Sequence, residues 1–530
     1  MAIAPTATYP AATPAFDPEA LDRRKVFTFL FMVFGMFMAI LDVQIVSASL
    51  AEIQAGLSAS SSEITWVQTS YLIAEVIMIP LSGFLSRAFG TRYLFSISAA
   101  GFTFSSFMCG LSSDITSMIF WRAVQGFIGG AMIPTVFATS YTIFPRSKMA
   151  MVTPLIGLVA TMAPTIGPTV GGYLTNTLSW HWLFFINVIP GIFVTLAAYT
   201  RIDFDKPDLS LLKNFDWIGL ISMAGFLGAL EYALEEGPRN DWFNDDAVLI
   251  TSVVSVISGI VFVGRVLTTR APIVDIRAFS NRNFGVGSVF SFVLGIGLYG
   301  LTYLYPVYLG AIRGYDSLMI GETMFVTGLA MLCTAPIAGR LIRVIDPRLM
   351  MLMGFGSIGL STYLMTGITR DWDYWEILVP QVLRGFGLMC SFLPINNLAL
   401  GSLPPERIKN AAGLYNLTRN LGGAVGLALL NTLLNDRTDF HLARLHEQIT
   451  WSRGPVVETL DALTRNLSSF GSSAQSMALQ QLNLIVHRQG VVMAFADVFW
   501  VLTAMFAALA CFTFVMQRPP DVGAPAGGEH

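Results

Sequence analysis

Charged residues are scarce in this chain, and their scarcity excludes most soluble folds. Asp, Glu, Lys and Arg make up only 12% of the 530 residues, whereas 54% are hydrophobic and the mean hydropathy is +0.62. An ordinary soluble domain carries roughly 25% charged residues. With a formal net charge of -3 and no basic stripe, the chain has no footprint for nucleic acid. The composition therefore predicts an all-α protein embedded in a lipid bilayer.

Cysteine is rare as well, and the sequence motifs of common enzymes are missing. The four cysteines (Cys109, Cys333, Cys390 and Cys511) lie far apart inside apolar segments, with no spacing that suits a disulfide framework or a metal site. The chain has no Walker motif and no nucleophile constellation. We therefore expect neither an enzyme nor an ATP-driven pump, and we expect no metal or other cofactor.

Long apolar runs, in contrast, are abundant. A membrane-spanning helix needs about 20 predominantly apolar residues, and fourteen such segments occur between short polar breaks. They are predicted at 26–50, 64–86, 93–112, 115–143, 149–174, 180–200, 216–234, 247–267, 284–310, 318–341, 349–368, 376–401, 410–433 and 491–516. The first 20 residues lack the apolar centre of a cleavable signal peptide, so both ends are predicted to be disordered tails.

The positions of Lys and Arg predict how these helices are oriented. Of the 31 basic residues, 20 lie in the termini or in loops that follow even-numbered segments. The short loops on the other side hold only Arg239, Arg313 and Arg370. The positive-inside rule therefore places both termini in the cytoplasm.

An internal repeat predicts how the segments are grouped. Residues 80–92 share Pro, Gly, Leu and two Arg with residues 336–348, at an offset of 256. A second echo relates 122–127 to 381–386 at an offset of 259, with Arg and Gln exchanged. Two six-helix halves in a parallel repeat are typical of the major facilitator fold, which here has an inserted helix pair. The predicted units are a cytoplasmic tail 1–25, an N-terminal bundle 26–200, the inserted helices and their loops 201–283, a C-terminal bundle 284–516 and a tail 517–530.

Several motifs give the chain a resemblance to a known family. They are Leu41-Asp42-Val-Gln-Ile-Val, the loop motif from Gly83, Arg122-x-x-Gln125-Gly126, Gly167-Pro168-x-x-Gly171-Gly172, Trp180-x-Trp182-x-Phe-Phe-Ile-Asn187, Pro272-Ile-Val-Asp275, Asn281-Arg-Asn-Phe284 and Leu403-Pro-Pro-Glu-Arg407. Over nearly its whole length the chain resembles the EmrB/QacA-type fourteen-span drug/proton antiporters of the major facilitator superfamily, and within them the EmrB branch.

The resemblance implies a function. It implies proton-driven export of amphipathic or hydrophobic drugs by alternating access, as a multi-pass protein of the bacterial inner membrane that contributes to antibiotic resistance. Its expected partners are an EmrA-type periplasmic adaptor and an outer-membrane channel, which together form a tripartite efflux system. The alternatives are a dedicated exporter of one metabolite or siderophore, and an uncoupled facilitator.

Two glycine-rich stretches are predicted to take part in gating. The antiporter motif of the superfamily's exporters lies in segment 149–174, where small residues and prolines allow close packing and, by resemblance, a rocking seam. The residues concerned are Gly157, Pro164, Gly167, Pro168, Gly171 and Gly172. The cytoplasmic loop motif comprises Gly83, Arg87, Gly90 and Arg92. Because Arg87 stands where the family usually has Asp, the usual charge pairing that latches the cytoplasmic side is in doubt.

Asp42 and Arg122 are the first candidates for proton coupling. An ionisable group inside a span costs at least about 2.5 to 3.5 kcal/mol, so a function is expected of it. Both residues fall roughly 12 Å below the outer surface, at 1.5 Å per residue, and are predicted to pair. The pair would hold Asp42 ionised, and separation would let Asp42 take up a proton. A static ion pair that fixes two helices is the alternative.

Glu75 is the third candidate for proton coupling, because it stands near the middle of its segment. It shares a helical face with Tyr71 and Met78, and this face suits a cationic, aromatic substrate. A hydrogen-bonded packing role is the alternative for Glu75. Other candidate substrate contacts, for which gating or helix bridging is equally open, are Gln125, Arg384, Asn416 and Arg419.

Polar residues near the outer ends of the segments have simpler explanations. Interfacial solvation is favoured for three acids near these ends, which are Glu231, Glu322 and Asp497. The polar segment 434–490 is predicted to form amphipathic helices over the periplasmic mouth, where by resemblance an adaptor docks. Its histidines are expected to be solvated rather than bound to metal, and they are His441, His446 and His487.

Overall fold

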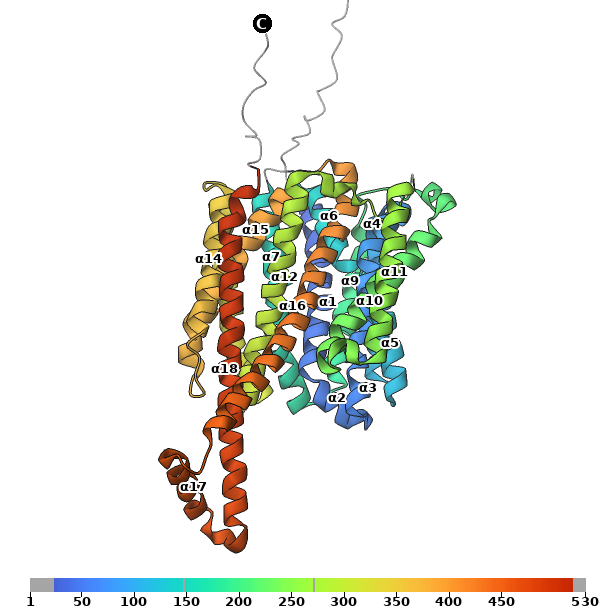
Figure 1. Cartoon of the computed structure of the whole chain (residues 1–530). Helices are drawn as coiled ribbons and strands as arrows, with labels where there is room; N and C mark the ends of the chain where they lie inside the picture. The colour runs from blue at the N-terminus through green and yellow to red at the C-terminus, as the bar shows by residue number, and fades with distance from the viewer. Residues whose placement is uncertain (1–22, 146–147, 270–271, 518–530) are drawn as a thin grey trace, which may run out of the picture.

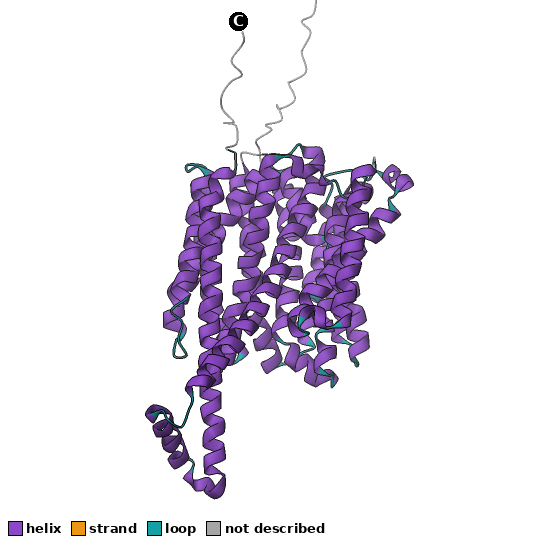
Figure 2. Cartoon of the chain, in the orientation of Figure 1, coloured by secondary structure: helices purple, strands orange, loops and turns teal. Residues whose placement is uncertain are grey.

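The structure is built almost entirely of helices, as the apolar segments predict. The computed structural model describes residues 23–145, 148–269 and 272–517, and no strand occurs in these ranges. Figure 2 shows the helices packed side by side and joined by short loops. A helix satisfies its own backbone hydrogen bonds, which lipid cannot do, so a chain of this composition folds as helices. The all-α prediction is confirmed, while the predicted tails fall mostly outside the described residues.

The helices follow the predicted units in chain order. The N-terminal half contains α1 (Arg23–Ala48), α2 (Leu50–Leu57), α3 (Ser61–Ile64), α4 (Trp66–Gly110), α5 (Ile115–Gly129), α6 (Met132–Ile143), α7 (Met149–Thr177), α8 (Trp182–Phe185) and α9 (Val188–Arg201). The insert contains η2 (Leu209–Asn214), α10 (Trp217–Glu236), η3 (Gly237–Arg239), η4 (Trp242–Asn244), α11 (Asp246–Thr268) and η5 (Ile276–Ser280). The C-terminal half contains α12 (Arg282–Tyr308), η6 (Leu309–Arg313), α13 (Ser317–Leu341), α14 (Pro347–Met365), α15 (Tyr374–Leu400), α16 (Pro405–Gln448), α17 (Gly454–Asn466), η7 (Ser468–Ser473), α18 (Ala474–Phe512) and η8 (Thr513–Val515).

Within the described residues, ten helices are long and apolar enough to cross a membrane. One of them, α4, covers two predicted segments, because its backbone leaves helical geometry at Gly90 (φ 80°, ψ 155°) and so divides into two helices. Glycine adopts this positive φ without a steric penalty. Three further predicted segments coincide with α7, α14 and α16, of which α16 continues into polar sequence. The prediction of fourteen spans is consistent with this arrangement.

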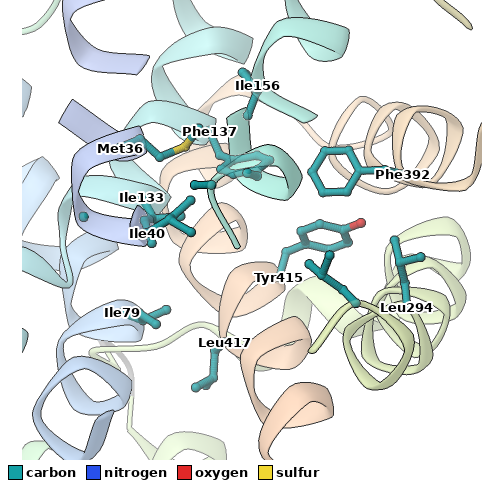
Figure 3. Packing of buried hydrophobic residues seen from close by; sticks show 14 of the residues in the cluster. Met36, Ile40, Ile79, Ile133, Phe137, Ile156, Leu294, Phe392, Tyr415 and Leu417 are labelled. Carbon is teal, nitrogen blue, oxygen red and sulfur yellow. The ribbon is translucent and has the colours of Figure 1, made fainter. Parts of the chain in front are cut away.

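The two halves meet in one hydrophobic cluster. Figure 3 shows side chains of α1, α4, α6 and α7 facing side chains of α12, α15 and α16. We call this cluster the interhalf core, and its labelled members are Met36, Ile40, Ile79, Ile133, Phe137, Ile156, Leu294, Phe392, Tyr415 and Leu417. The rings of Phe137 and Phe392 lie 6.3 Å apart across the interface, measured between centroids. Because its members come from both halves, the interhalf core fixes how the halves sit together.

The inserted helices α10 and α11 lie at one side of the bundle (Figure 1). α10 packs against α4 and α16, whereas α11 packs against α10. On α11 the side chains of Ile250, Ile257 and Ile260 are more than half exposed, as expected of a helix that faces lipid. The inner helix of the insert therefore contacts one helix of each half.

The segment 434–490 forms a helical hairpin. α16 runs without interruption to Gln448, α17 packs against α18, and α18 already begins at Ala474. The hairpin projects away from the bundle (Figure 1). The predicted helices are present, but the prediction that they cover the mouth is wrong, because they extend two membrane helices instead of folding back. We call this end of the bundle the hairpin end, and the opposite end, where α1 begins and α18 ends, the terminal end.

Asp497 fixes the base of the hairpin. Its Oδ2 lies 2.6 Å from Nε of Arg437 and 2.8 Å from Nε2 of His441, and these contacts join α18 to α16. Asp497 stays partly exposed, as interfacial solvation predicts, but the sequence did not reveal that basic residues of α16 also pair with it. His441 is one of the two residues of α16 that contact Asp497.

Glycines bring α12 and α16 into backbone contact. A Cβ atom at Gly422 would lie 2.0 Å from the carbonyl oxygen of Phe292, and one at Gly295 would lie 2.2 Å from the carbonyl oxygen of Arg419. Membrane helices approach this closely only where small residues face each other.

We expect Gly422→Ala to lower the midpoint of thermal unfolding, measured by tryptophan fluorescence of the protein in detergent. Inserting a methyl group into a closely packed contact costs about 1–3 kcal/mol. Gly356→Ala on α14 is the control, because its Cβ would enter open space with no described neighbour within 4 Å, and it should not lower the midpoint. Equal midpoints for the two variants would contradict the tight α12–α16 contact.

Candidate transport site

A buried ion pair lies in the N-terminal half. Nη1 of Arg122 lies 2.6 Å from Oδ2 of Asp42, and neither side chain is exposed. Asp42 comes from α1 and Arg122 from α5, so the pair joins two helices that are 80 residues apart in sequence. The structure thus brings together the two residues that the depth estimate paired.

Amides complete the surroundings of the Asp42 carboxylate. Its Oδ1 accepts hydrogen bonds from Nε2 of Gln125 at 3.2 Å and from Nδ2 of Asn187 at 2.7 Å. Gln125 also accepts a 2.8 Å hydrogen bond from Arg122, and Asn187 donates a second one to Ser106 at 3.1 Å. These donors offset the cost of removing an ionised carboxylate completely from water.

Arg122 is held from a third side by α4. Its Nε donates a 3.1 Å hydrogen bond to the carbonyl oxygen of Val67, and its guanidinium carbon lies 4.2 Å from the centroid of the Tyr71 ring. Gly126 makes this approach possible, since a Cβ there would lie 2.3 Å from the carbonyl oxygen of Tyr71. The structure places Tyr71 under the guanidinium and not at a cavity wall.

A cavity of about 420 Å³ lies between the two halves. Its wall includes residues near the hairpin end of the helices, such as Leu50, Thr65 and Pro238. Ile40 and Ile133 of the interhalf core also line it, so this core forms the floor. The position between the halves matches the expected place of a substrate site.

Glu75 of α4 lines this cavity and is only 7% exposed. It interacts electrostatically with both Arg122 and Asp42. Of the face that was predicted around it, Tyr71 and Met78 are buried in the protein and do not border the cavity. Glu75 therefore stands between the cavity and the sealed ion pair.

Arg384 and Arg419 are both buried in the C-terminal half. Nη2 of Arg384 donates a 2.6 Å hydrogen bond to Oγ1 of Thr302, which lines the cavity, and no acid pairs with Arg384 among the described residues. Arg419 donates a hydrogen bond to Asn416, and its guanidinium carbon lies 5.1 Å and 5.3 Å from the ring centroids of Phe137 and Phe392. Arg419 thus bridges the two halves within the interhalf core.

The antiporter motif of α7 packs against both halves. Added Cβ atoms would lie 2.4 Å from Cβ of Gln44 at Gly167 and 3.0 Å from the carbonyl oxygen of Ile45 at Gly171, so this part of α7 lies on α1. The other residues of the motif lie along the same helix. Gly157 faces Phe392 of α15, Pro168 lines the cavity, Gly172 is buried, and the side chain of Pro164 lies outside the described residues.

At the terminal end, Asp205 connects the loop motif to the other half. Its carboxylate accepts hydrogen bonds from the backbone nitrogen of Thr91 at 3.0 Å and from Oγ1 of Thr91 at 2.9 Å, and it forms an ion pair with Lys409 of α16. Gly83 lies directly on α16, where its Cβ would be 2.9 Å from the Lys409 carbonyl oxygen. Asp205, in the segment after α9, therefore supplies the negative charge that Arg87 cannot provide.

The other residues of the loop motif have local contacts. Nε of Arg87 donates a 3.4 Å hydrogen bond to the carbonyl oxygen of Gly83, and the guanidinium of Arg92 lies 4.7 Å from the centroid of the Tyr199 ring. Arg87 also interacts electrostatically with Asp275 of the insert.

Sequence reasoning missed four residues of this arrangement. Asn187 is the last residue of one of the motifs that carry the family resemblance, and this was the sequence feature that could have identified it. Asp205 had no local signal. Glu231 and Glu235 of α10 line the cavity, and Glu231 is only 6% exposed, so its predicted interfacial solvation is wrong. The packing of α10 between the halves removes Glu231 from the membrane interface.

Comparisons with known proteins agree with this fold. Residues 32–427 match the model of the Major Facilitator Superfamily. Among solved structures, the human organic anion transporter MFSD10 aligns with a TM-score of 0.57 at 11% identity, over 92% of this chain and 100% of that chain. This likeness confirms the predicted major facilitator fold.

Three curated relatives align over nearly the full length. The chain is 42% identical over 490 residues to the colistin resistance protein EmrB of Acinetobacter baumannii, covering 92% of this chain and 96% of the relative. It is 30% identical over 495 residues (93% and 96%) to the multidrug export protein EmrB of Escherichia coli, and 30% identical over 498 residues (94% and 96%) to the fatty acid resistance protein FarB of Neisseria gonorrhoeae. The chain therefore belongs to the EmrB-type efflux transporters of the major facilitator superfamily, which are multi-pass membrane proteins and not enzymes.

Proposed function

We propose that this protein is a proton-coupled antiporter that exports amphipathic or hydrophobic drugs across the bacterial inner membrane by alternating access. In this proposal the terminal end faces the cytoplasm and the hairpin end faces the periplasm, as the basic residues predict. The observation that carries the proposal is the Asp42–Arg122 pair, which is sealed from the cavity while Glu75 faces it.

The coupling follows from this arrangement. Arg122 holds Asp42 as a carboxylate, and both charges are removed from solvent. When α1 and α5 shift against each other, the pair separates and a buried carboxylate is left, which proton uptake neutralises. A substrate beside Glu75 changes the field at the pair, because Glu75 already interacts with both members. Substrate binding and proton binding therefore compete through one network.

We expect drug binding to release protons from the purified protein in detergent, recorded with a pH indicator in weak buffer, because the drug shifts molecules with a separated pair and a protonated Asp42 toward the ion-paired state. Asp42→Asn should abolish the release, because the variant has no carboxylate to exchange a proton in this pair. Loss only in Glu75→Gln would move the proton site to α4. No release from the wild type would favour the uncoupled facilitator or the dedicated exporter.

A fold control is needed, because Asp42→Asn leaves Arg122 buried without its acid, a change that costs about 3–5 kcal/mol. The double variant Asp42→Asn, Arg122→Gln removes both charges and should unfold at a higher temperature than the single variant. Glu322→Gln alters an exposed acid outside the cavity and should release protons like the wild type.

The Asp205–Lys409 pair is proposed to hold the terminal end closed. An ion pair of about 1 kcal/mol shifts the ratio of closed to open states about fivefold. Spin labels are placed at Phe89 and Leu349, which are exposed residues of the two halves, in a background without the exposed Cys333 and Cys511. We expect Asp205→Asn to add a population with a longer distance between the two labels. Asp203→Asn, an exposed acid of the same segment, is the matched control. Identical distance distributions for the two variants would contradict a latch at Asp205.

The hairpin is proposed to bind an EmrA-type adaptor, so that the protein forms the inner-membrane part of a tripartite system with an outer-membrane channel. Its projection from the hairpin end and its exposed Trp451 and Phe470 support this role. Replacing 449–473 with a short Gly-Ser linker should abolish co-purification with a co-expressed adaptor, while drug-induced proton release persists. Unchanged co-purification would contradict the proposal that the hairpin binds the adaptor.

A further inference from the structure

The inserted helix α10 presents acidic residues to the central cavity. Gly228, Glu231 and Glu235 are spaced by three and four residues, so they share one face of α10. A Cβ at Gly228 would lie 3.3 Å from Ile73 and 3.5 Å from Ile77. This face therefore points toward the part of α4 that carries Glu75.

Contacts near the hairpin end hold α10 in this place. The ring of Tyr232 lies 5.5 Å from that of Trp66 of α4, measured between centroids. Nε1 of Trp242 donates a 2.9 Å hydrogen bond to Oγ1 of Thr432 of α16. α10 and the turn after it are thus fixed to both halves, and α10 forms a wall of the cavity between them.

Two of the acids in this wall have no protein partner. Glu75 is 7% exposed and Glu231 is 6% exposed, and neither forms a hydrogen bond or an ion pair with any described residue. Glu231 interacts electrostatically with Glu75 and Glu235, so the three acids form one cluster. Among the residues that line the cavity, Arg239 is the single basic one. Buried acids that the protein leaves unpaired are available to a ligand.

Aromatic side chains of α12 complete the wall. Tyr299 and Tyr303 line the cavity one helical turn apart, and Tyr299 interacts electrostatically with Glu75 and Glu231. Their hydroxyls donate hydrogen bonds to Oδ1 of Asn420 at 3.4 Å and of Asn431 at 3.3 Å, which orients the rings. Tyrosine rings attract organic cations. A cavity of about 420 Å³ accepts a molecule of drug size.

We propose that Glu75, Glu231 and Glu235 form a subsite for the positively charged group of an amphipathic organic cation, so that the inserted helix α10 takes part in substrate selection. The proposal rests on the drug-export function proposed above and names the charge class of substrate that this cavity selects. The aromatic and apolar lining holds the remainder of the molecule.

The test compares two fluorescent probes of opposite charge character on the full-length protein in detergent at neutral pH. Ethidium is a permanent aromatic cation, and N-phenyl-1-naphthylamine is a neutral aromatic molecule. We expect the double variant Glu231→Gln, Glu235→Gln to bind ethidium at least about tenfold more weakly, because charge-assisted contacts are lost. Its affinity for the neutral probe should stay within about twofold of the wild type. Glu322→Gln, which changes an exposed acid outside the cavity, should bind both probes like the wild type.

Three outcomes overturn the proposal. Unchanged ethidium affinity in the double variant would show that the α10 acids do not contact the cation. An equal loss for both probes would assign the effect to the shape of the cavity and not to its charge. A wild type that binds the neutral probe but not ethidium would leave drug export standing and remove the cation subsite. Failure of proton release, in contrast, would affect only the coupling and leave the subsite in place.

Discussion

A carboxylate that is buried in a membrane protein must be neutralised by its surroundings, and Asp42 meets this constraint by holding several helices together. Its oxygens accept hydrogen bonds from Arg122 and Gln125 of α5 and from Asn187 at the start of α9. Arg122 in turn bonds to the α4 backbone at Val67. Loss of any one member leaves a buried polar group unsatisfied, so the network fixes α1, α4, α5 and α9 relative to one another. Glu75 lies one helical turn after Tyr71 on α4. Because the network fixes α4, it also fixes the position of Glu75 at the cavity.

The two halves repeat the same fold but not the same electrostatics. The echo around Gly126 and Gly385 preserves an Arg and a Gln, yet Arg384 donates to Thr302 and to the carbonyl oxygen of Leu298 and has no acid partner among the described residues. Arg419 instead lies beside the rings of Phe137 and Phe392, within cation–π distance of both. The ionised pair and the cavity acids therefore lie in the N-terminal half and in α10, while the C-terminal half contributes tyrosines and amides. The two halves therefore differ in where their acids lie, a difference that an exact repeat would not have.

The sequence predicted those features that depend on composition and on position along one helix. Apolar runs indicated the helices, and depth along two segments was sufficient to pair Asp42 with Arg122. The places where prediction failed depend on how helices pack. Glu231 and Asp497 lie near segment ends, where solvation is the usual explanation. Instead, Glu231 lines the cavity, and Asp497 pairs with Arg437 of α16. Asp205 lies 114 residues from Thr91, and no local pattern connects an acid in one loop to a motif in another. Polar sequence in 434–490 predicted helices but not their direction, because direction follows from the continuity of α16 and α18.

In the proposed alternating-access cycle, the closed state depends more on the interhalf core than on the proposed Asp205–Lys409 latch. Burying one large apolar side chain contributes about 1.5–3 kcal/mol, so even a few members of the core outweigh an ion pair of about 1 kcal/mol such as Asp205–Lys409. In that cycle, opening the terminal end separates Phe137 from Phe392 and moves Arg419 away from their rings. That step replaces apolar contacts and cation–π contacts with solvation of the guanidinium, which offsets part of the loss. In this proposal, solvation of Arg419 lowers the free-energy cost of opening a largely apolar barrier. The interhalf core sets the balance between closed and open states, and the Asp205–Lys409 pair only biases it.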